Sequence, residues 1–235
     1  MERVSTGIKE LDGKIEEGYP RNRTTLLSGT TGSGKTILGL HFIYNGCSDG
    51  KKCAMIATEE TPEDLLSQAE SIGLPLSKYY KNGVLAIERV YDERAEYIKD
   101  VLAFDITNID ELQSNIIGLL DRIPKDTEIV LIDNIGVFTL NMSTNEFRAQ
   151  FDALIHGLAK KNVTSVIILD SASDERTGGI AAYSVYGVIK TLIKENPYTG
   201  SKERLIEILK MRNTKTQLDP IRFEVTSNGI VLLKK

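Results

Sequence analysis

Residues 26–38 read LLSGTTGSGKTIL, a short apolar run, a loop rich in glycine and the beginning of a helical pattern. The segment 29–36 fits the pattern GxxxxGK[ST]. Glycines let such a loop turn successive backbone N–H groups toward phosphate oxygens, and the following helix adds the positive end of its dipole. A chance glycine loop is the alternative, but an apolar strand before it and a helix after it argue against chance. We therefore expect a phosphate-binding loop formed by Gly29, Thr30, Thr31, Gly32, Ser33, Gly34, Lys35 and Thr36.

Two polar side chains of this loop have predicted roles, and a third group completes a metal site. Lys35 is expected to neutralise the β- and γ-phosphate oxygens, and the Thr36 hydroxyl to bind Mg²⁺. The apolar run IVLID ends at Asp133, where a carboxylate that holds Mg²⁺ belongs. Alone, an aspartate after a strand is more often a solvated loop residue. Together with the phosphate-binding loop, Asp133 predicts that ATP and Mg²⁺ are the cofactors.

A pair of acidic residues indicates hydrolysis. Glu59 and Glu60 follow the next apolar run in the segment ATEETPEDL. An ATP hydrolase needs a carboxylate that orients the attacking water and takes its proton. We expect one of the two glutamates to act with Lys35 in catalysis and the other to support it. The alternative is that both glutamates are only N-terminal charges that interact favourably with the dipole of the next helix.

The order of these segments also points to a class of hydrolase. The phosphate-binding loop is followed by the strand that ends in acids and then by the strand that ends at Asp133. This order indicates an additional strand between the strands of the loop and of Asp133, an arrangement of ATP hydrolases. A GTPase would need a guanine-reading NKxD segment, which the sequence lacks.

Apolar strands alternate with helical patterns along most of the chain. Strands are expected at 24–28, 53–58, 84–90, 128–133 and 165–170, and helices at 35–45, 61–73, 109–122 and 144–161. Residues 171–184 resemble a loop in composition. The last segments, RLIEILKM, IRFEV and GIVLL, predict antiparallel strands with SNG as a tight turn. The fold class is therefore α/β, a single domain over 1–235 with a mostly parallel twisted sheet, helices on both faces and a C-terminal antiparallel β-hairpin.

Composition limits the classes of partner. The chain has 235 residues and a formal net charge of −4, so it has no overall positive field for nucleic acid or anionic lipid. Its two cysteines form no Cys/His cluster, which fits a reducing compartment. No apolar run reaches the length of a membrane span, and MERVSTGIKE lacks the apolar core of a signal peptide. We expect a cytoplasmic protein without membrane association.

Beyond these motifs, the sequence resembles a KaiC-type domain of the RecA/RadA ATPase superfamily over nearly its whole length. The matching segments are STGIKELDGKIEEGYPRNRTTLLSGTTGSGKTILGLHFIYNG (5–46), EETPEDL (59–65), FDITNIDEL (104–112), STNEFRAQF (143–151) and EILKMRNTKT (207–216). Among such proteins, a stand-alone domain of this length looks most like the archaeal RadA paralogues, also called archaeal RadC proteins.

The resemblance implies a RecA-like P-loop core that hydrolyses ATP with Mg²⁺. It places the catalytic glutamate at Glu59 or Glu60, and the nucleotide-sensing position at Asp170 or Ser171.

It also implies that Lys210 and Arg212 contact the ATP of a neighbouring subunit, which makes further copies of this chain an expected partner. Two positions apart on a predicted strand, their side chains share one face. A cation reaching across a subunit boundary stabilises transition-state charge. The alternative is that both are surface cations on an edge strand.

The same kinship implies single-stranded DNA as a partner. In RecA-like recombinases the loops after the corresponding strands hold DNA, here 136–144 and 171–183. The second segment contains Arg176, Gly178, Gly179 and Tyr183, which offer a phosphate partner, adaptable backbone and a stacking ring. Nearby acids prevent a basic groove. One alternative is that surrounding lysines supply positive charge, but solvated helix faces explain them better; these are Lys160, Lys161, Lys190 and Lys194. DNA binding is therefore expected to be weak and salt-sensitive.

One departure from the recombinases shapes the functional hypothesis. The phosphate-binding loop begins at Gly29, so we expect that the chain lacks the front-end regions of a strand-exchange enzyme and does not catalyse strand exchange alone. The leading hypothesis is a slowly hydrolysing ATPase that binds single-stranded DNA or a RadA-type recombinase and modulates recombination or repair. The alternative is a KaiC-like signalling or scaffold ATPase that acts through protein partners. Autokinase activity is a third idea, although Ser184 is a lone hydroxyl where KaiC has a Ser/Thr pair.

Overall fold

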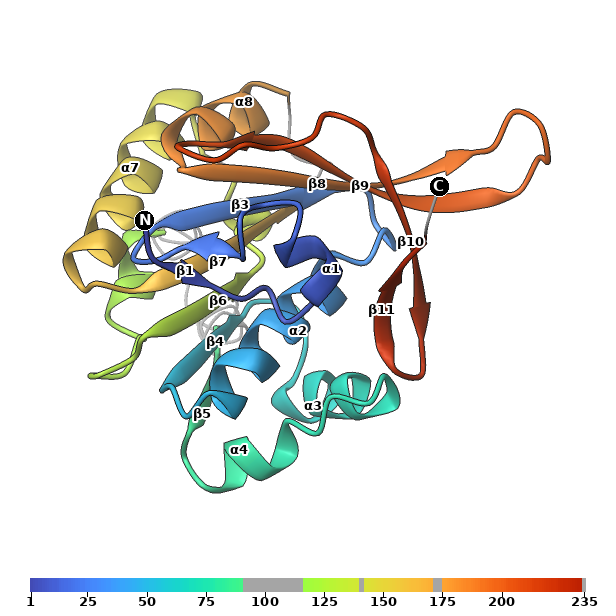
Figure 1. Ribbon diagram of the computed structural model, residues 1–235. Coiled ribbons are helices and arrows are strands. Elements are labelled where there is room, and N and C mark those ends of the chain that lie inside the picture. Colours follow the sequence, from blue (N-terminus) through green and yellow to red (C-terminus); the bar gives the residue numbers. More distant parts are fainter. Residues whose placement is uncertain (91–115, 140–141, 171–174, 234–235) are drawn as a thin grey trace, which may run out of the picture.

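The computed structural model describes residues 1–90, 116–139, 142–170 and 175–233, and its centre is a nine-stranded sheet (Figure 1). The strand order is β11-β10-β9-β8-β3-β7-β6-β4-β5. Neighbouring strands from β8 to β5 pair in parallel, and β9, β10 and β11 extend the sheet in antiparallel fashion. In chain order these strands are β3 (Thr24–Gly29), β4 (Cys53–Ala57), β5 (Leu85–Arg89), β6 (Ile129–Asp133), β7 (Thr164–Asp170), β8 (Gly187–Glu195), β9 (Lys202–Met211), β10 (Ile221–Thr226) and β11 (Gly229–Leu232).

Helices cover both faces of this sheet, and a short ribbon of β1 and β2 lies beside it (Figure 1). The ribbon and helices are β1 (Arg3–Val4), α1 (Lys9–Asp12), β2 (Tyr19–Pro20), α2 (Lys35–Ser48), α3 (Pro62–Ser71), α4 (Ser77–Lys81), the 3₁₀ helices η1 (Ile117–Leu120) and η2 (Gly136–Phe138), α7 (Thr144–Lys160) and α8 (Glu175–Ser184). Among the residues with described structure, no helix is long and apolar enough to span a bilayer.

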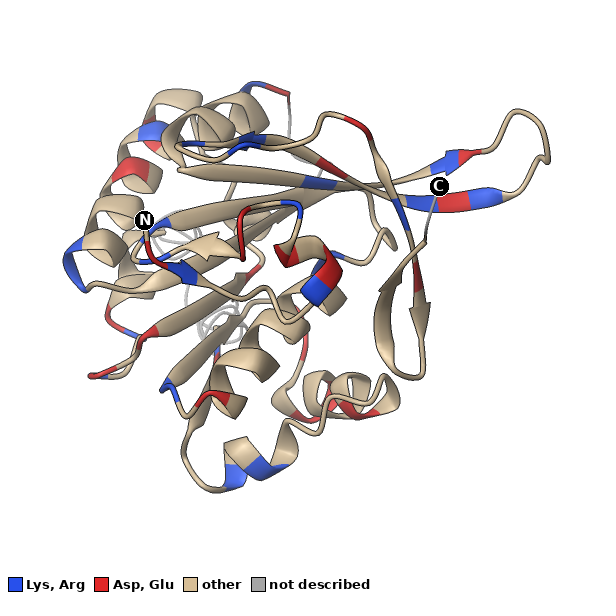
Figure 2. Ribbon diagram, in the orientation of Figure 1, with Lys and Arg blue, Asp and Glu red and all other residues tan. Residues whose placement is uncertain are grey.

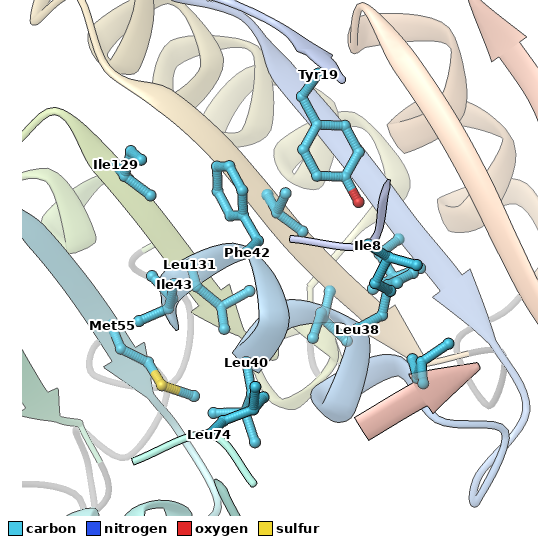
Figure 3. Packing of buried hydrophobic residues seen from close by; sticks show 14 of the residues in the cluster. Ile8, Tyr19, Leu38, Leu40, Phe42, Ile43, Met55, Leu74, Ile129 and Leu131 are labelled. Carbon is cyan, nitrogen blue, oxygen red and sulfur yellow. The ribbon is translucent and has the colours of Figure 1, made fainter. Parts of the chain in front are cut away.

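The parallel strands read as nearly continuous apolar runs because both of their faces are buried. Alternate residues of β6 belong to two different core clusters, Leu131 to one and Ile132 to the other. Figure 3 shows the first cluster, in which α2 packs Leu38 and Phe42 against the sheet. Helices α7 and α8 bury their apolar faces in the second cluster. The two clusters fix the sheet between its helical layers and hold its strand ends in place.

The sequence predicted most of this architecture. The predicted strands and the C-terminal hairpin are confirmed, and β7 lies between β3 and β6 as the order of motifs indicated. Helix α3 begins as predicted, because the Thr61 hydroxyl accepts a hydrogen bond from the Asp64 backbone N–H at 3.0 Å and Pro62 occupies the first turn.

Three predictions differ from the structure. The loop expected at 171–184 is wrong over 175–184, which form α8, because burial of Thr177 and Ala181 outweighs the two glycines. Of the helix expected at 109–122, the described part contains only the short 3₁₀ helix η1, which ends at Leu120. Residues 109–115 lie outside the described residues. Strand β8 was missed, since its lysines obscure the apolar pattern.

Candidate functional site

The carboxyl ends of β3, β7, β6 and β4 meet at one edge of the sheet, because these strands are neighbours and parallel. A cleft of about 340 Å³ opens at this edge. The residues expected from the sequence that line it are Thr31, Gly32, Gly34, Lys35, Thr36, Glu59, Glu60, Asp133 and Asp170. Segments far apart in the chain thus converge on one site.

The loop between β3 and α2 has a shape that its sequence requires. Gly29 and Gly34 have φ angles of 154° and 99°. A Cβ at Gly29 would lie 2.1 Å from the carbonyl oxygen of Thr191 in β8, so the close approach of these strands needs glycine. The Ser33 hydroxyl lies 2.6 Å from the Thr30 carbonyl oxygen and 2.7 Å from the Thr191 hydroxyl. These contacts hold the loop curled ahead of the first turn of α2.

Lys35 begins α2 and its side chain is buried against the loop. Its ammonium group donates hydrogen bonds to the carbonyl oxygens of Gly29 and Thr30, at 3.0 and 2.9 Å. It also donates to the carboxylate of Asp170 at 3.0 Å. The lysine is therefore positioned where phosphate oxygens would enter, at the end of β3.

Thr36 and Asp133 form a pair of oxygen groups beside the loop. The Thr36 hydroxyl hydrogen-bonds with the Asp133 carboxyl. The pKa of Asp133 is raised to about 6. Burial is the main cause and the nearby Glu60 and Glu59 add to it, while the Thr36 hydroxyl and Lys35 lower the pKa in part. A hydroxyl and a carboxylate fit Mg²⁺, which takes few protein ligands and completes its shell with phosphates and water. Among the described residues, no group of three or more His, Cys, Asp or Glu forms a separate metal site.

Glu59 and Glu60 lie just beyond the end of β4, as predicted. The side-chain amide of Asn134 donates a hydrogen bond to Glu59, with 2.5 Å between Nδ2 and Oε2. Burial raises the pKa of Glu60, and Asp64 and Glu59 add to the effect. The two glutamates thus differ in surroundings: one is held by a neutral amide and the other lies among acids.

Asp170 ends β7 directly opposite Gly29 of β3. It accepts hydrogen bonds from Lys35 and, at 3.3 Å, from the Thr31 hydroxyl. The other residue predicted for the sensing position, Ser171, lies outside the described residues.

Sequence reasoning missed several residues of the cleft. Arg204 of β9 reaches it and donates a hydrogen bond from Nε to the Gly32 carbonyl oxygen at 3.3 Å. Asn134 was missed although it directly follows Asp133, a position that could have signalled it. The other unpredicted lining residues are Ile37, Gln68 and Val225.

Lys210 and Arg212 do not line this cleft. Lys210 donates to the carbonyl oxygens of Ala182 and Tyr183, at 2.6 and 3.2 Å, and Arg212 donates to that of Tyr183 at 3.2 Å. Both side chains therefore lie at the carboxyl end of α8, although Arg212 lies just beyond the end of β9 at Met211 and not on the strand, where it was expected. Burial lowers the pKa of Lys210, and the neighbouring Arg212 lowers it further.

The predicted DNA-contacting residues lie on α8 and are not part of a loop. Arg176, Gly179 and Tyr183 line a hollow of about 350 Å³ together with Arg148 of α7. Gly178 lies on the same helix. The Tyr183 side chain is 73% exposed.

The sequence and the fold match a known group of proteins. A family profile described as "ATPase: KaiC" matches residues 4–235. The chain belongs to the KaiC family of ATPases. This KaiC-family chain is 30% identical to the UPF0273 protein of Methanopyrus kandleri, over 98% of its own length and 91% of that protein. It is 31% identical to the circadian clock oscillator protein KaiC of Nostoc sp. over 98% of its length, but spans 44% of that protein.

A solved structure agrees. The crystal structure of a KaiC-like protein from the hyperthermophilic archaeon Pyrococcus horikoshii superposes with a TM-score of 0.76, at 27% identity and 99% coverage of both chains. The KaiC-family protein therefore has a RecA-type ATPase core with C-terminal antiparallel strands. The family assignment does not extend to the archaeal RadA paralogues in particular.

Proposed function

We propose that this KaiC-family protein binds ATP with Mg²⁺ in the cleft, hydrolyses it slowly, and uses its nucleotide state to control assembly with a protein partner. One observation carries the proposal: Lys35, the Thr36–Asp133 pair and the Asn134-held Glu59 meet at one edge of the sheet. Phosphate contacts, metal ligands and a water-activating carboxylate are the parts that phosphoryl transfer to water requires.

Each part has a defined task. The loop N–H groups and Lys35 would hold the phosphates, and the Thr36 hydroxyl and the Asp133 carboxylate would hold Mg²⁺. When bound, Mg²⁺ neutralises charge on the β- and γ-phosphate oxygens. Glu59 orients the attacking water and accepts its proton, and Asn134 orients Glu59. Glu60 lies among acids and supports the site electrostatically.

Slow turnover follows from the charges of the cleft. Among its described lining residues, the cations Lys35 and Arg204 face more carboxylates than they can balance, those of Glu59, Glu60, Asp133 and Asp170. Lys210 and Arg212 face the end of α8 in their own chain, so they would serve the cleft only across a subunit boundary. The molar mass in solution, measured with and without a non-hydrolysable ATP analogue, tests that assembly. A monomer in both states rejects a role for the two cations in a neighbouring site.

Phosphate release from Mg·ATP tests the central claim. Wild-type protein should hydrolyse ATP, chelation of Mg²⁺ should stop it, and Lys35→Ala should abolish it. Lys160→Ala, which removes a cation from the end of α7, is the matched control and should retain activity. Undiminished hydrolysis by a folded Lys35→Ala protein would exclude this cleft as the ATP site.

Charge distribution favours a protein partner over nucleic acid. The β8–β9 hairpin projects from the body of the molecule and carries positive and negative residues interspersed (Figure 2). Lys194 pairs with Glu207 and Arg222 with Glu203, both at 3.3 Å. Such compensated charges do not form the continuous cationic track that follows a nucleic-acid backbone.

The second candidate is modulation of recombination or repair through single-stranded DNA or a RadA-type recombinase. The observation in its favour is the hollow between α7 and α8, where Arg148 and Arg176 flank the exposed Tyr183. A gel shift with single-stranded DNA across a salt series separates the candidates, because phosphate contacts are strongest at low salt. A shift that Tyr183→Ala and Arg148→Ala weaken supports DNA binding, and the absence of any shift at low salt rejects it.

A further inference from the structure

The Lys35 ammonium is fully hydrogen-bonded within the protein. A lysine ammonium has three N–H donors and no acceptor. In this structure the three donors contact the carbonyl oxygens of Gly29 and Thr30 and the Asp170 carboxylate, at 3.0, 2.9 and 3.0 Å. No donor of this group is left for a phosphate. A nucleotide that uses Lys35 must therefore displace at least one of these three acceptors.

Asp170 is the acceptor that a phosphate replaces most directly. The two carbonyls belong to the backbone of the loop, and moving them would distort the loop itself. Asp170 is a side chain at the end of β7, and it contacts both Lys35 and the Thr31 hydroxyl through the same oxygen. It bears the same sign of charge as a phosphate. The Asp170 carboxylate thus accepts the Lys35 hydrogen bond that a phosphate oxygen would otherwise accept.

The charge of the cleft makes this competition costly for a nucleotide. Carboxylates of Glu59, Glu60, Asp133 and Asp170 line the cleft against the cations of Lys35 and Arg204. Asp170 is the member of this set in direct contact with Lys35. A triphosphate that replaces it at Lys35 remains close to the released carboxylate and is repelled by it. Mg²⁺ reduces that repulsion by lowering the charge of the phosphates.

We propose that Asp170 is a positioning residue that holds Lys35 as its counter-ion in the nucleotide-free cleft and yields this contact to a phosphate, which makes the cleft select Mg²⁺-complexed over free triphosphate. This inference rests on the proposed function of the cleft. Asp170 acts through Lys35. Its carboxylate competes with the nucleotide phosphates for Lys35 and so weakens nucleotide binding.

Removal of the charge gives a measurable gain. In Asp170→Asn the side chain keeps its size but no longer pairs with Lys35 as an ion. The variant should bind a non-hydrolysable ATP analogue with Mg²⁺ about threefold more tightly than wild type, and without Mg²⁺ about tenfold more tightly. The gain is larger without Mg²⁺ because the unshielded phosphates feel more repulsion from the carboxylate. Preference for the Mg²⁺ complex should therefore shrink.

Isothermal titration of the analogue, with Mg²⁺ and with EDTA, provides the test. Asp126→Asn is the matched control: it removes one negative charge from an exposed turn outside the cleft, at a φ of 65° that asparagine also tolerates. It should bind like wild type. Asp170→Ser removes the same charge with a shorter side chain, and serves if the Asn variant does not fold. Unchanged or weaker binding by a folded Asp170 variant overturns the proposal, and weaker binding would make Asp170 a ligand of the nucleotide.

Rejection of the Asp170 proposal can be distinguished from rejection of the proposed function. If wild-type protein neither binds the analogue nor hydrolyses ATP, the cleft is not an ATP site and both inferences fail. If wild type binds, Lys35→Ala does not, and Asp170→Asn binds like wild type, only the role of Asp170 is rejected.

Discussion

The side-chain amide of Asn134 lies 2.5 Å from the Glu59 carboxylate and donates a hydrogen bond to it. The amide is held in place from two sides. The side-chain oxygen of Asn134 accepts a hydrogen bond from the Gly136 backbone N–H at 2.7 Å. The Asn134 backbone N–H donates to the Thr58 hydroxyl, and this hydroxyl donates to the Asn134 carbonyl oxygen, both at 2.8 Å. Because Thr58 precedes Glu59, these bonds join the ends of β4 and β6 and fix the orientation of the carboxylate.

This contact distinguishes the two candidate bases. Glu59→Gln should lower kcat for ATP hydrolysis by about 100-fold or more, the usual effect of losing a general base, and should leave the affinity for nucleotide nearly unchanged. Glu60→Gln should have the smaller effect on kcat. Steady-state phosphate release together with analogue binding checks both values. A larger loss of kcat in Glu60→Gln would reverse the assignment.

The ionised Asp133 carboxylate should destabilise the folded protein at neutral pH. Burial raises its pKa from 3.8 to about 6, so the folded state holds the proton more tightly than the unfolded chain. The contribution of Asp133 to the free energy of unfolding is therefore fully present below about pH 4 and is lost as the pH rises through 6. At pH 7, Asp133→Asn should increase the free energy of unfolding by about 3 kcal/mol and abolish Mg²⁺-dependent hydrolysis.

Urea unfolding at pH 7 and pH 4 measures this effect. The difference between Asp133→Asn and wild type should shrink at pH 4, where the wild-type carboxyl is protonated when folded. Asp126→Asn should stay within about 0.5 kcal/mol of wild type at both values. A destabilised Asp133→Asn protein at pH 7 would show that the carboxylate is well solvated.

The parts of the site that could be predicted are those whose geometry is local in sequence. The loop around Lys35 needs glycine, lysine and threonine at fixed spacing, so its sequence pattern is enough to predict its structure. The Thr61 cap of α3 is equally local. Asp133 and Glu59 follow apolar runs, and parallel strands bring such ends to one edge.

The remaining parts depend on contacts between distant segments. Arg204 lies 172 residues from Gly32, its hydrogen-bond partner, and reaches the cleft only through the pairing of β9 with β8. No local pattern signals that register. Helix α8 depends on burial against α7, which composition does not show. The Lys35–Asp170 bond likewise follows from β7 lying beside β3.

His41 should make stability fall in mild acid. It lies on α2, accepts the Ile230 backbone N–H at 2.9 Å and hydrogen-bonds the Gly7 backbone. Burial lowers its pKa from 6.5 to about 4, so the unfolded chain takes up the proton first as the pH falls. Its stabilising contribution is therefore complete above 6.5 and is lost as the pH falls toward 4.

Between pH 7 and pH 5 this loss amounts to about 2 kcal/mol. His41→Gln removes the titration and should lose less stability over the same interval, as measured by urea unfolding. His156→Gln on α7 is the control and should follow the wild-type profile. Parallel profiles for wild type and His41→Gln would refute a buried neutral imidazole at this position.

Two glycines of the phosphate-binding loop should respond differently to alanine. A Cβ at Gly29 would lie 2.1 Å from the Thr191 carbonyl oxygen, so Gly29→Ala must displace β8 or the loop. A Cβ at Gly32 meets no atom within 4 Å, and only its φ of 75° is unfavourable. Gly32→Ala should cost about 1 kcal/mol of unfolding free energy and Gly29→Ala about 3 kcal/mol or more. Equal losses by urea unfolding would mean that β8 yields readily at Thr191.

Arg204 and Lys210 lie on the same strand, but their side chains lead to different places. Arg204 reaches the nucleotide cleft of its own chain, whereas Lys210 contacts the carboxyl end of α8. Arg204→Ala should therefore weaken binding of the ATP analogue about tenfold at every protein concentration, since its charge is lost within one chain. Lys210→Ala should bind the analogue like wild type when the protein is monomeric.

Protein concentration is the variable that separates the two cations. If Lys210 serves a neighbouring subunit, Lys210→Ala should lower kcat only at concentrations where wild-type protein associates, because only there does a second cleft meet it. Phosphate release over a dilution series, with molar mass measured on the same samples, gives both quantities. Weaker analogue binding by dilute Lys210→Ala would instead mean that the lysine acts on the cleft of its own chain through α8.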